Sequence, residues 1–464
     1  MTAPNALDTP HDAPRIFGPA YRTATFGILL VVTLVAFEGM SVSVIMPEVS
    51  SDLRALDLYG VSFSAFFIAS LFANVVAGLW ADRRGYALPF LAGLGLFVLG
   101  MALAGAAGGK EMFLVARAVQ GLGAGPTVVA LYVMIARVYP QDVRPRVFAA
   151  LSAAWVLPSM IGPSVAGFVA ERLDWRWVFF GIIPLVVPAL LMLMPSLRRP
   201  SDGHEPATGP RADPRAMTVA ATATAAGSGL LLYGVDALYE SPLVSALWCL
   251  IGLAALGYGL AKLLPPRALR FGRGLPTTVM MRGLFAAGFF GVNGFIPLAL
   301  TDVKGFSVAQ AGIALTTGAL GWSSGSYLQS RRVVPAHRRI RTGAACVTLG
   351  ILMVAPSVVP GVTGWIAVPA WIVAGFGMGL AMATINVTAL RQSPVNEQGA
   401  NSAALSVTDM LGSALALGIA GALSNLIGHT PEQIAVGFAV ICGLMALIGL
   451  AATFLAARVA DPAT

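Results

Sequence analysis

Apolar residues in this chain occur in long runs that are nearly free of charge and are separated by short polar stretches. Each run holds roughly 20 residues, enough for a helix to cross ~30 Å of hydrocarbon. Apolar and polar residues do not alternate within the runs, as they do in the strands of a membrane barrel. The pattern therefore predicts an all-α polytopic membrane protein with transmembrane helices over residues 24–46, 58–80, 87–107, 112–136, 147–170, 176–196, 217–238, 243–264, 279–300, 308–329, 342–359, 364–390, 400–427 and 433–457, fourteen in all.

The composition supports this prediction. Of the 464 residues, 57% are hydrophobic and only 11% are charged, and the mean hydropathy is +0.80. A soluble protein would carry about a quarter charged residues. The polar tail over residues 1–23 lacks the layout of a cleaved signal, so we expect the first apolar run to remain in the membrane.

The net charge of +8 is distributed unevenly over the connections between the predicted helices. Basic residues gather on alternate connections, 19 against 5, and such residues mark cytoplasmic loops. Both termini are therefore predicted to be cytoplasmic, and the charge requires no nucleic-acid partner. The basic set is Arg83, Arg84, Arg137, Arg144, Arg146, Arg198, Arg199, Arg211, Arg215, Lys262, Arg267, Arg270, Arg273, Arg331, Arg332, Arg338, Arg339, Arg341 and Arg391, and the other is Arg54, Lys110, Arg172, Arg176 and Lys304.

Two distant segments of the chain resemble each other without a gap. GLGAG at 121–125 aligns with GFGMG at 375–379, and AALS at 149–152 recurs at 403–406, both at an offset of 254. Small residues are common in membrane helices, but equal offsets favour duplication over chance. We therefore predict two six-helix bundles and two linking helices, divided as tail 1–23, N-terminal bundle 24–196, loop and linking helices 197–264, C-terminal bundle 265–457 and tail 458–464.

Five short motifs carry a resemblance to a known family. Together they are similar to signatures of the major facilitator superfamily and, within it, of the fourteen-span drug:proton antiporters. The motifs are EGMSVSVIMP at 38–47, GLWADRRG at 78–85, RAVQGLGAG at 117–125, PSMIGPSVAG at 158–167 and WRWVFFGIIP at 175–184. The resemblance implies two bundles that rock about a site near the membrane midplane.

The motif at 78–85 lies in a short predicted cytoplasmic turn. Gly85 suits a turn position that needs positive φ, and Gly78 would allow another helix to approach closely. By the resemblance, Asp82 is a conformational gate whose partner lies in the opposite bundle, and Arg83 belongs to the same gate. The alternative is that Arg83 and Arg84 only anchor the loop to anionic lipid.

The motif at 158–167 resembles the antiporter motif of the fifth span. Pro158 and Pro163 each remove a backbone hydrogen bond, and Gly162 and Gly167 expose backbone, so we expect a kinked helix with a flat face of small residues. Such a face packs tightly against another helix. A purely structural kink is the alternative.

Charged residues inside a membrane are costly and are functional candidates. Glu38, Arg117 and Asp409 lie within predicted spans. Burial disfavours the charged form of an acid, so Glu38 or Asp409 is predicted to be the proton-coupling site. Arg117 stays charged and would modulate that acid. The alternative is that these residues form fixed ion pairs that stabilise the fold.

Four uncharged side chains are candidates for the substrate cavity. Asn293 and Asn386 could line it, although hydrogen bonding between helices explains them equally well. Trp155 and Phe289 could stack on a planar cargo, although packing within the bundle is the alternative.

These observations predict a proton-coupled efflux transporter, an antiporter of lipophilic or amphipathic small molecules in the inner (cytoplasmic) membrane. No GxxxxGK[ST] loop, HExxH motif or His/Cys cluster occurs in the sequence, so we expect no ATP, metal or cofactor and no enzyme activity. The expected partners are small lipophilic substrates, protons and the bilayer, and the expected state is a monomer. Alternatives are a proton symporter that imports a nutrient, a dedicated lipid exporter of the same fold, and a non-transporting sensor or intramembrane enzyme.

Overall fold

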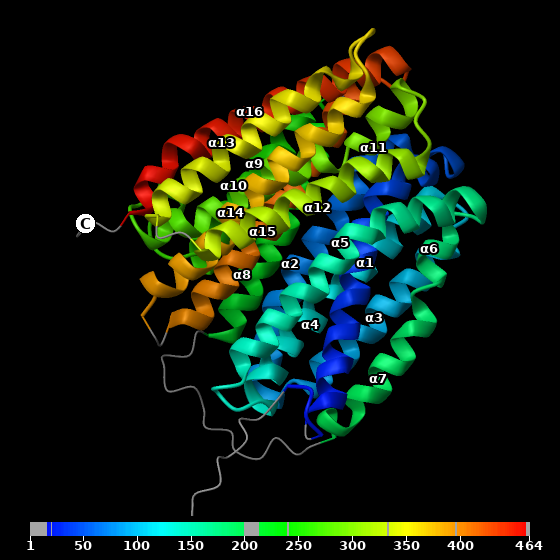
Figure 1. Cartoon of the computed structure of the whole chain (residues 1–464). Helices are drawn as coiled ribbons and strands as arrows, with labels where there is room; N and C mark the ends of the chain where they lie inside the picture. The colour runs from blue at the N-terminus through cyan, green and yellow to red at the C-terminus, as the bar shows by residue number, and fades with distance from the viewer. Residues whose placement is uncertain are drawn as a thin grey trace, which may run out of the picture.

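The computed structural model of the chain describes residues 16–19, 21–198, 213–238, 241–331, 334–394 and 397–460. These residues form a bundle of long helices (Figure 1). The α-helices are α1 (Arg22–Asp52), α2 (Tyr59–Arg84), α3 (Ala87–Gly105), α4 (Lys110–Val138), α5 (Arg144–Arg172), α6 (Arg176–Phe180), α7 (Ile183–Leu197), α8 (Pro214–Asp236), α9 (Pro242–Leu263), α10 (Leu275–Asn293), α11 (Ile296–Leu298), α12 (Val308–Arg331), α13 (Ala336–Val354), α14 (Ala367–Gln392), α15 (Gln398–Ile427) and α16 (Pro431–Leu455).

Shorter helical turns extend several of these helices. They are the 3-10 turns η1 (Leu56–Leu58), η2 (Ala268–Arg270), η4 (Ala355–Val358), η5 (Gly364–Ile366) and η7 (Ala456–Val459) and the π-helical turn η3 (Ala299–Val303). Each predicted span corresponds to one helical segment. The sixth combines α6 and α7, and the ninth combines α10, α11 and η3. The predicted tail over residues 1–23 lies mostly outside the described residues.

Within the described residues, 13 helices are long and apolar enough to cross a membrane. The predicted span over 308–329 is not among them. Its helix, α12, contains many Ser, Thr and Gly residues and lies against α5 and α14. Because protein covers much of α12, this helix does not need the fully apolar surface that a lipid-facing helix requires.

The repeated glycine motifs pack in the same way in both bundles. In the motif at 121–125, the outer glycines face the backbone of α2 and the central glycine faces α3. In the motif at 375–379, the outer glycines face α12 and the central one faces α13. An added Cβ at any of these positions would collide with a neighbouring helix. The structure thus gives α4 and α14 equivalent surroundings.

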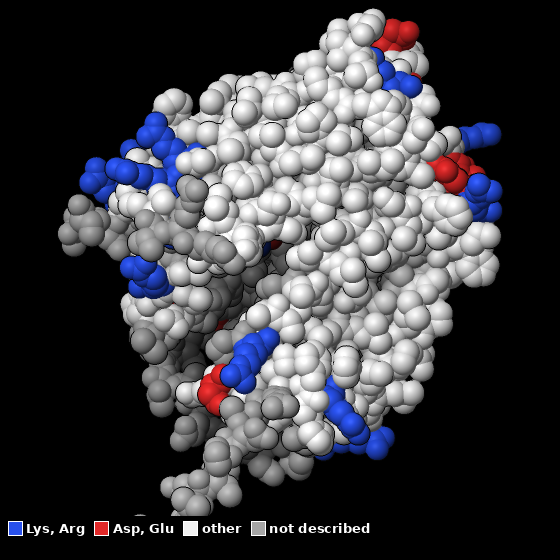
Figure 2. Space-filling model, in the orientation of Figure 1, with Lys and Arg blue, Asp and Glu red and all other residues white. Residues whose placement is uncertain are grey.

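The two bundles meet along two seams, where α2 packs on α15 and α5 packs on α12. The bundles contact each other closely near the start of α2. This end of the molecule is opposite the end where α1 begins. There the Tyr59 hydroxyl donates to the Gly294 carbonyl at 2.8 Å, and the Ser64 hydroxyl donates to the Ala414 carbonyl at 2.7 Å. Toward the opposite end, the surface is hollowed between the bundles (Figure 2).

The linking helices α8 and α9 pack on each other, and α8 also packs on both α2 and α15. Asn425 on α15 joins these elements, because its amide donates to the Asp57 carbonyl at 2.8 Å and to the Asp236 carboxylate at 3.2 Å. The linking pair therefore contacts both bundles.

Candidate functional site

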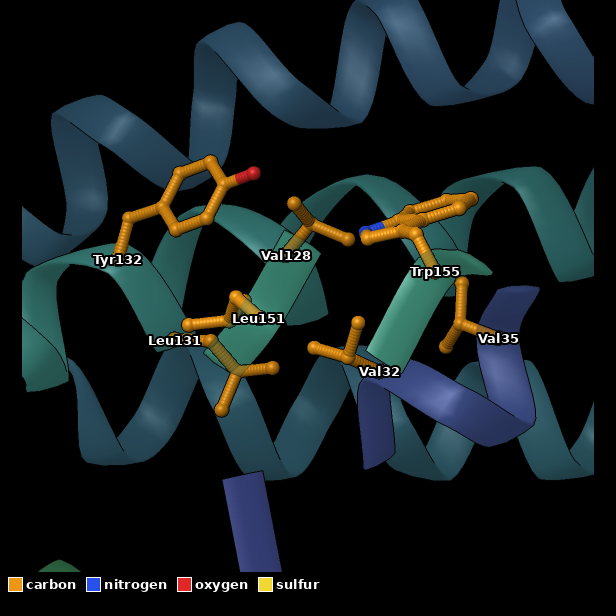
Figure 3. A pocket seen from close by; sticks show the side chains of 7 residues that line it. All are labelled: Val32, Val35, Val128, Leu131, Tyr132, Leu151 and Trp155. Carbon is orange, nitrogen blue, oxygen red and sulfur yellow. The ribbon is translucent and has the colours of Figure 1, made fainter. Parts of the chain in front are cut away.

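A small apolar pocket lies among three helices of the N-terminal bundle. Seven side chains from α1, α4 and α5 surround it, and two of them, a tyrosine and a tryptophan, carry polar atoms (Figure 3). Trp155 keeps 37% of its surface exposed, in agreement with a position on a cavity wall. The lining residues are Val32, Val35, Val128, Leu131, Tyr132, Leu151 and Trp155.

A buried ion pair lies inside the same bundle, between α1 and α4. Nη1 of Arg117 donates to Oε1 of Glu38 at 2.6 Å and to Oε1 of Gln120 at 2.6 Å. The side chains of Arg117 and Glu38 are only 3% and 1% exposed. Arg117 and Gln120 are three residues apart, so they share one face of α4. The guanidinium also lies over the Phe66 ring, 4.6 Å from its centroid, where a cation–π interaction stabilises it.

Several polar atoms at this ion pair have no hydrogen-bond partner among the described residues. They are Oε2 of Glu38, Nε of Arg117, Nε2 of Gln120 and the hydroxyl of Ser41, one helical turn from Glu38. Buried polar atoms without partners are costly. One carboxylate oxygen of Glu38 is therefore open to a proton or a water molecule.

A second ion pair lies in the C-terminal bundle, between α10 and α15. Nε of Arg282 donates to Oδ1 of Asp409 at 2.8 Å, and Nη2 donates to Oδ2 at 3.3 Å. Nη1 donates to Oδ1 of Asn386 on α14 at 3.2 Å. The side chains of Arg282 and Asp409 are 23% and 27% exposed, so water reaches this pair.

The structure brings Arg117 to Glu38, whereas Asp409 binds Arg282. Sequence reasoning missed Arg282 and Gln120. Arg282 is a single arginine inside the predicted span 279–300. A charge inside a membrane helix is energetically costly, and the same argument identified Arg117 as a candidate. Gln120 could have been found from its spacing to Arg117.

The four cavity candidates divide into two groups. Trp155 lines the pocket, and Asn386 is exposed beside the second ion pair. Phe289 packs inside the C-terminal bundle, because it is 4% exposed and stacks on Trp371 with centroids 4.9 Å apart. Asn293 accepts a hydrogen bond from Nε1 of Trp371 at 3.0 Å, which joins α10 to α14.

The loop motif adopts part of the expected geometry. Gly85 has φ +79°, which confirms the expected turn position. The expectation for Gly78 is wrong in this conformation, since no atom lies within 4 Å of an added Cβ and no helix approaches there. Asp82, Arg83 and Arg84 are exposed at the end of α2.

The motif of the fifth span lies on the seam between the bundles. A Cβ added to Gly167 would lie 2.7 Å from Cα of Ala309 on α12, and one added to Gly312 would lie 2.8 Å from the Pro163 carbonyl oxygen. Gly162 faces α1 instead, because a Cβ added there would lie 3.5 Å from Cδ2 of Phe37. Pro158 and Pro163 both lie within one continuous helix, α5. The small-residue face therefore joins α5 to the opposite bundle.

Comparison with known proteins gives a consistent result. Residues 28–417 match the sequence model of the Major Facilitator Superfamily. The "Multidrug efflux pump SdrM" of Staphylococcus aureus (strain N315) is 24% identical over 303 residues, 64% of this chain and 66% of that protein. The "Multidrug transporter protein MdtP" of Bacillus subtilis (strain 168) is 23% identical over 414 residues, 86% of this chain and 74% of that protein. The chain thus spans slightly less than two thirds of SdrM.

Solved structures show the same fold. An auto-inhibited POT family peptide transporter superposes with a TM-score of 0.67 at 17% identity, over 95% of this chain and 97% of that one. The nucleoside transporter NupG superposes with a TM-score of 0.66 at 11% identity, over 93% of this chain and 99% of that one. At such identities the likeness concerns the fold alone.

Proposed function

Since this chain belongs to the major facilitator superfamily of membrane transporters, we propose that it exports lipophilic or amphipathic small molecules across the cytoplasmic membrane in exchange for protons. Two relatives whose names describe multidrug efflux or transport support the cargo class.

The single observation that carries the proton coupling is the sealed pair of Glu38 and Arg117. Glu38 is buried and has one carboxylate oxygen without a partner. When Glu38 takes up a proton, its attraction to Arg117 weakens, and Arg117 then becomes an unpaired buried charge. Proton loss restores the pair. The two protonation states therefore favour different arrangements of α1 and α4, which is the requirement for coupling.

The seams and the hollow support an alternating-access cycle. The bundles touch at the end where α2 begins, and the hollow lies toward the end where α1 begins. With the basic connections on the cytoplasmic side, this conformation faces the cytoplasm. Cargo enters the hollow from the cytoplasm or the inner leaflet, and rocking of the bundles releases it outside.

The test is transport by purified protein in proteoliposomes under an imposed pH gradient, with a panel of dyes, antibiotics and lipids as cargo. We expect Glu38→Gln to abolish gradient-driven accumulation and Asp409→Asn to weaken it. Glu432→Gln, an exposed acid in the first turn of α16, is the matched control and should transport normally.

Three results would contradict the proposal. Full coupling in both Glu38→Gln and Asp409→Asn would remove the proton site. Net cargo movement in the same direction as protons would make the protein a symporter. Transport of lipids alone from the panel would make it a dedicated lipid exporter.

A further inference from the structure

The ion pair of the C-terminal bundle lies open to water, unlike its counterpart in the N-terminal bundle. Arg282 approaches Asp409 side-on, so both carboxylate oxygens accept a hydrogen bond from the guanidinium, at 2.8 and 3.3 Å. The third side of the guanidinium donates to Asn386. About a quarter of each charged side chain is exposed. A dissolved ion or a cargo group can therefore reach the pair.

Tight helix packing fixes the backbones that carry this pair. A Cβ added to Gly412 on α15 would collide with the carbonyl of Gly283 on α10. The hydroxyl of Thr408, next to Asp409, donates to the Val279 carbonyl at 3.0 Å. Arg282, Asp409 and Asn386 all belong to one bundle, so rocking of the two bundles does not itself separate them. Rocking therefore leaves the pair intact, whereas another ion that reaches Asp409 can replace the guanidinium.

The wall contributed by the other bundle is aromatic. Tyr132 and Trp155 line the pocket, and Tyr132 packs on Phe148 with ring centroids 5.9 Å apart. Aromatic faces attract cations through the ring quadrupole. A carboxylate attracts cations as well, and in this conformation the guanidinium of Arg282 occupies the carboxylate of Asp409.

We propose that Arg282 is an internal counter-cation, which neutralises Asp409 while the hollow is empty and which a lipophilic cation displaces on binding. The displaced guanidinium keeps Asn386 as its hydrogen-bond acceptor. Arg282 then lies close to the bound cation and repels it, so it lowers the affinity for cations and leaves the affinity for neutral compounds unchanged. Arg282 is thus a specificity-determining residue, and its role in export rests on the proposed function.

The experiment measures binding rather than transport, with purified full-length protein in detergent micelles and no pH gradient. The probes are tetraphenylphosphonium, its neutral analogue triphenylphosphine oxide and the anion tetraphenylborate, each titrated by calorimetry. We expect Arg282→Gln to bind the cation about tenfold more tightly, the order expected from removing one like charge near a surface, with unchanged binding of the neutral probe. Arg282→Lys, which keeps the charge, should bind like the wild type.

Two further variants separate this role from a general structural one. Asp409→Asn should lose the preference for the cation over the neutral probe. Asn386→Ala should weaken cation binding several-fold in the wild type, because the displaced guanidinium loses its acceptor, and should have no effect when Arg282 is already Gln. Thermal unfolding of each variant confirms that the compared proteins are folded.

Equal or weaker binding of tetraphenylphosphonium by Arg282→Gln would overturn the proposal. Weaker binding of tetraphenylborate by the same variant, together with unchanged binding of tetraphenylphosphonium, would instead make Arg282 an anion-binding residue. Because the assay needs no gradient, failure of proton coupling at Glu38 would leave its outcome unaffected, and failure here would leave the proposed antiport intact.

Discussion

The two bundles share one packing pattern, but they differ at two equivalent positions. At each of them one bundle has a charged residue where the other has a tryptophan. The offset of 254 that relates the glycine motifs also pairs Arg117 with Trp371 and Trp155 with Asp409. Inside the N-terminal bundle, Arg117 binds Glu38. At the equivalent place in the C-terminal bundle, Trp371 is fully buried and stacks on Phe289. At the other equivalent position, the first bundle carries Trp155 on the wall of the apolar pocket, and the second carries Asp409, which binds Arg282.

This exchange separates the two electrostatic tasks of the transporter. The sealed pair in the first bundle has polar atoms without partners, so its free energy depends strongly on whether Glu38 carries a proton. The pair in the second bundle is partly exposed and has Asn386 beside it, so its charges cost less to separate. On the proposed function, this difference favours proton coupling in the first bundle and cargo selection in the second.

The largest expected effect is on stability. We expect Glu38→Gln to lower the free energy of unfolding by about 3 to 5 kcal/mol, because Arg117 is left charged and unpaired in the interior. Asp409→Asn should cost about 1 kcal/mol or less, because water screens the partly exposed pair. Denaturation of the purified proteins in detergent micelles measures both values.

The double variant with Glu38→Gln and Arg117→Gln is the control for this comparison. It should recover most of the lost stability and remain inactive in gradient-driven transport. Equal destabilisation by Glu38→Gln and Asp409→Asn would show that the two pairs are not different environments.

The seam between the bundles gives an intermediate effect. Gly167→Ala places a Cβ 2.7 Å from Cα of Ala309, so it should push α5 away from α12. We expect transport to slow about tenfold, which corresponds to a rise of about 1.4 kcal/mol in the activation free energy. Gly95→Ala on α3 is the matched control, since its Cβ meets nothing within 4 Å.

Cysteines at Ser164 and Thr316 report on this seam directly, because the native hydroxyls lie 3.2 Å apart across it. The yield of disulfide cross-linking should fall in the Gly167→Ala background and stay unchanged with Gly95→Ala. A normal yield with Gly167→Ala would mean that α5 and α12 tolerate the added methyl group.

The smallest expected effect is at the loop motif. Asp82→Asn should slow transport about two- to fivefold without changing expression, the size expected for one exposed charge contact. Its exposure at the end of α2 accounts for the limited magnitude. Initial transport rates at matched protein levels measure the change. An unaltered rate would rule out a gating role for Asp82.

Much of the fold could be predicted from the sequence, because hydropathy reports directly on the environment that each stretch of a membrane helix requires. Thirteen of the spans, the turn at Gly85 and the relation between the two glycine motifs follow from such local signals, whereas α12 depends on its protein neighbours. The buried charges were equally visible, since Glu38, Arg117 and Asp409 interrupt apolar runs. Arg282 gave the same signal and could have been found.

Only the tertiary structure decided which charges meet. Pairing depends on how each helix is rotated about its axis and which neighbour it touches, and a linear pattern carries neither quantity. Glu38 therefore pairs with Arg117 and Asp409 with Arg282 because α1 lies beside α4 and α10 beside α15. The same rotation buries Phe289 against Trp371, leaves Trp155 on the cavity wall and leaves Gly78 without a close neighbour.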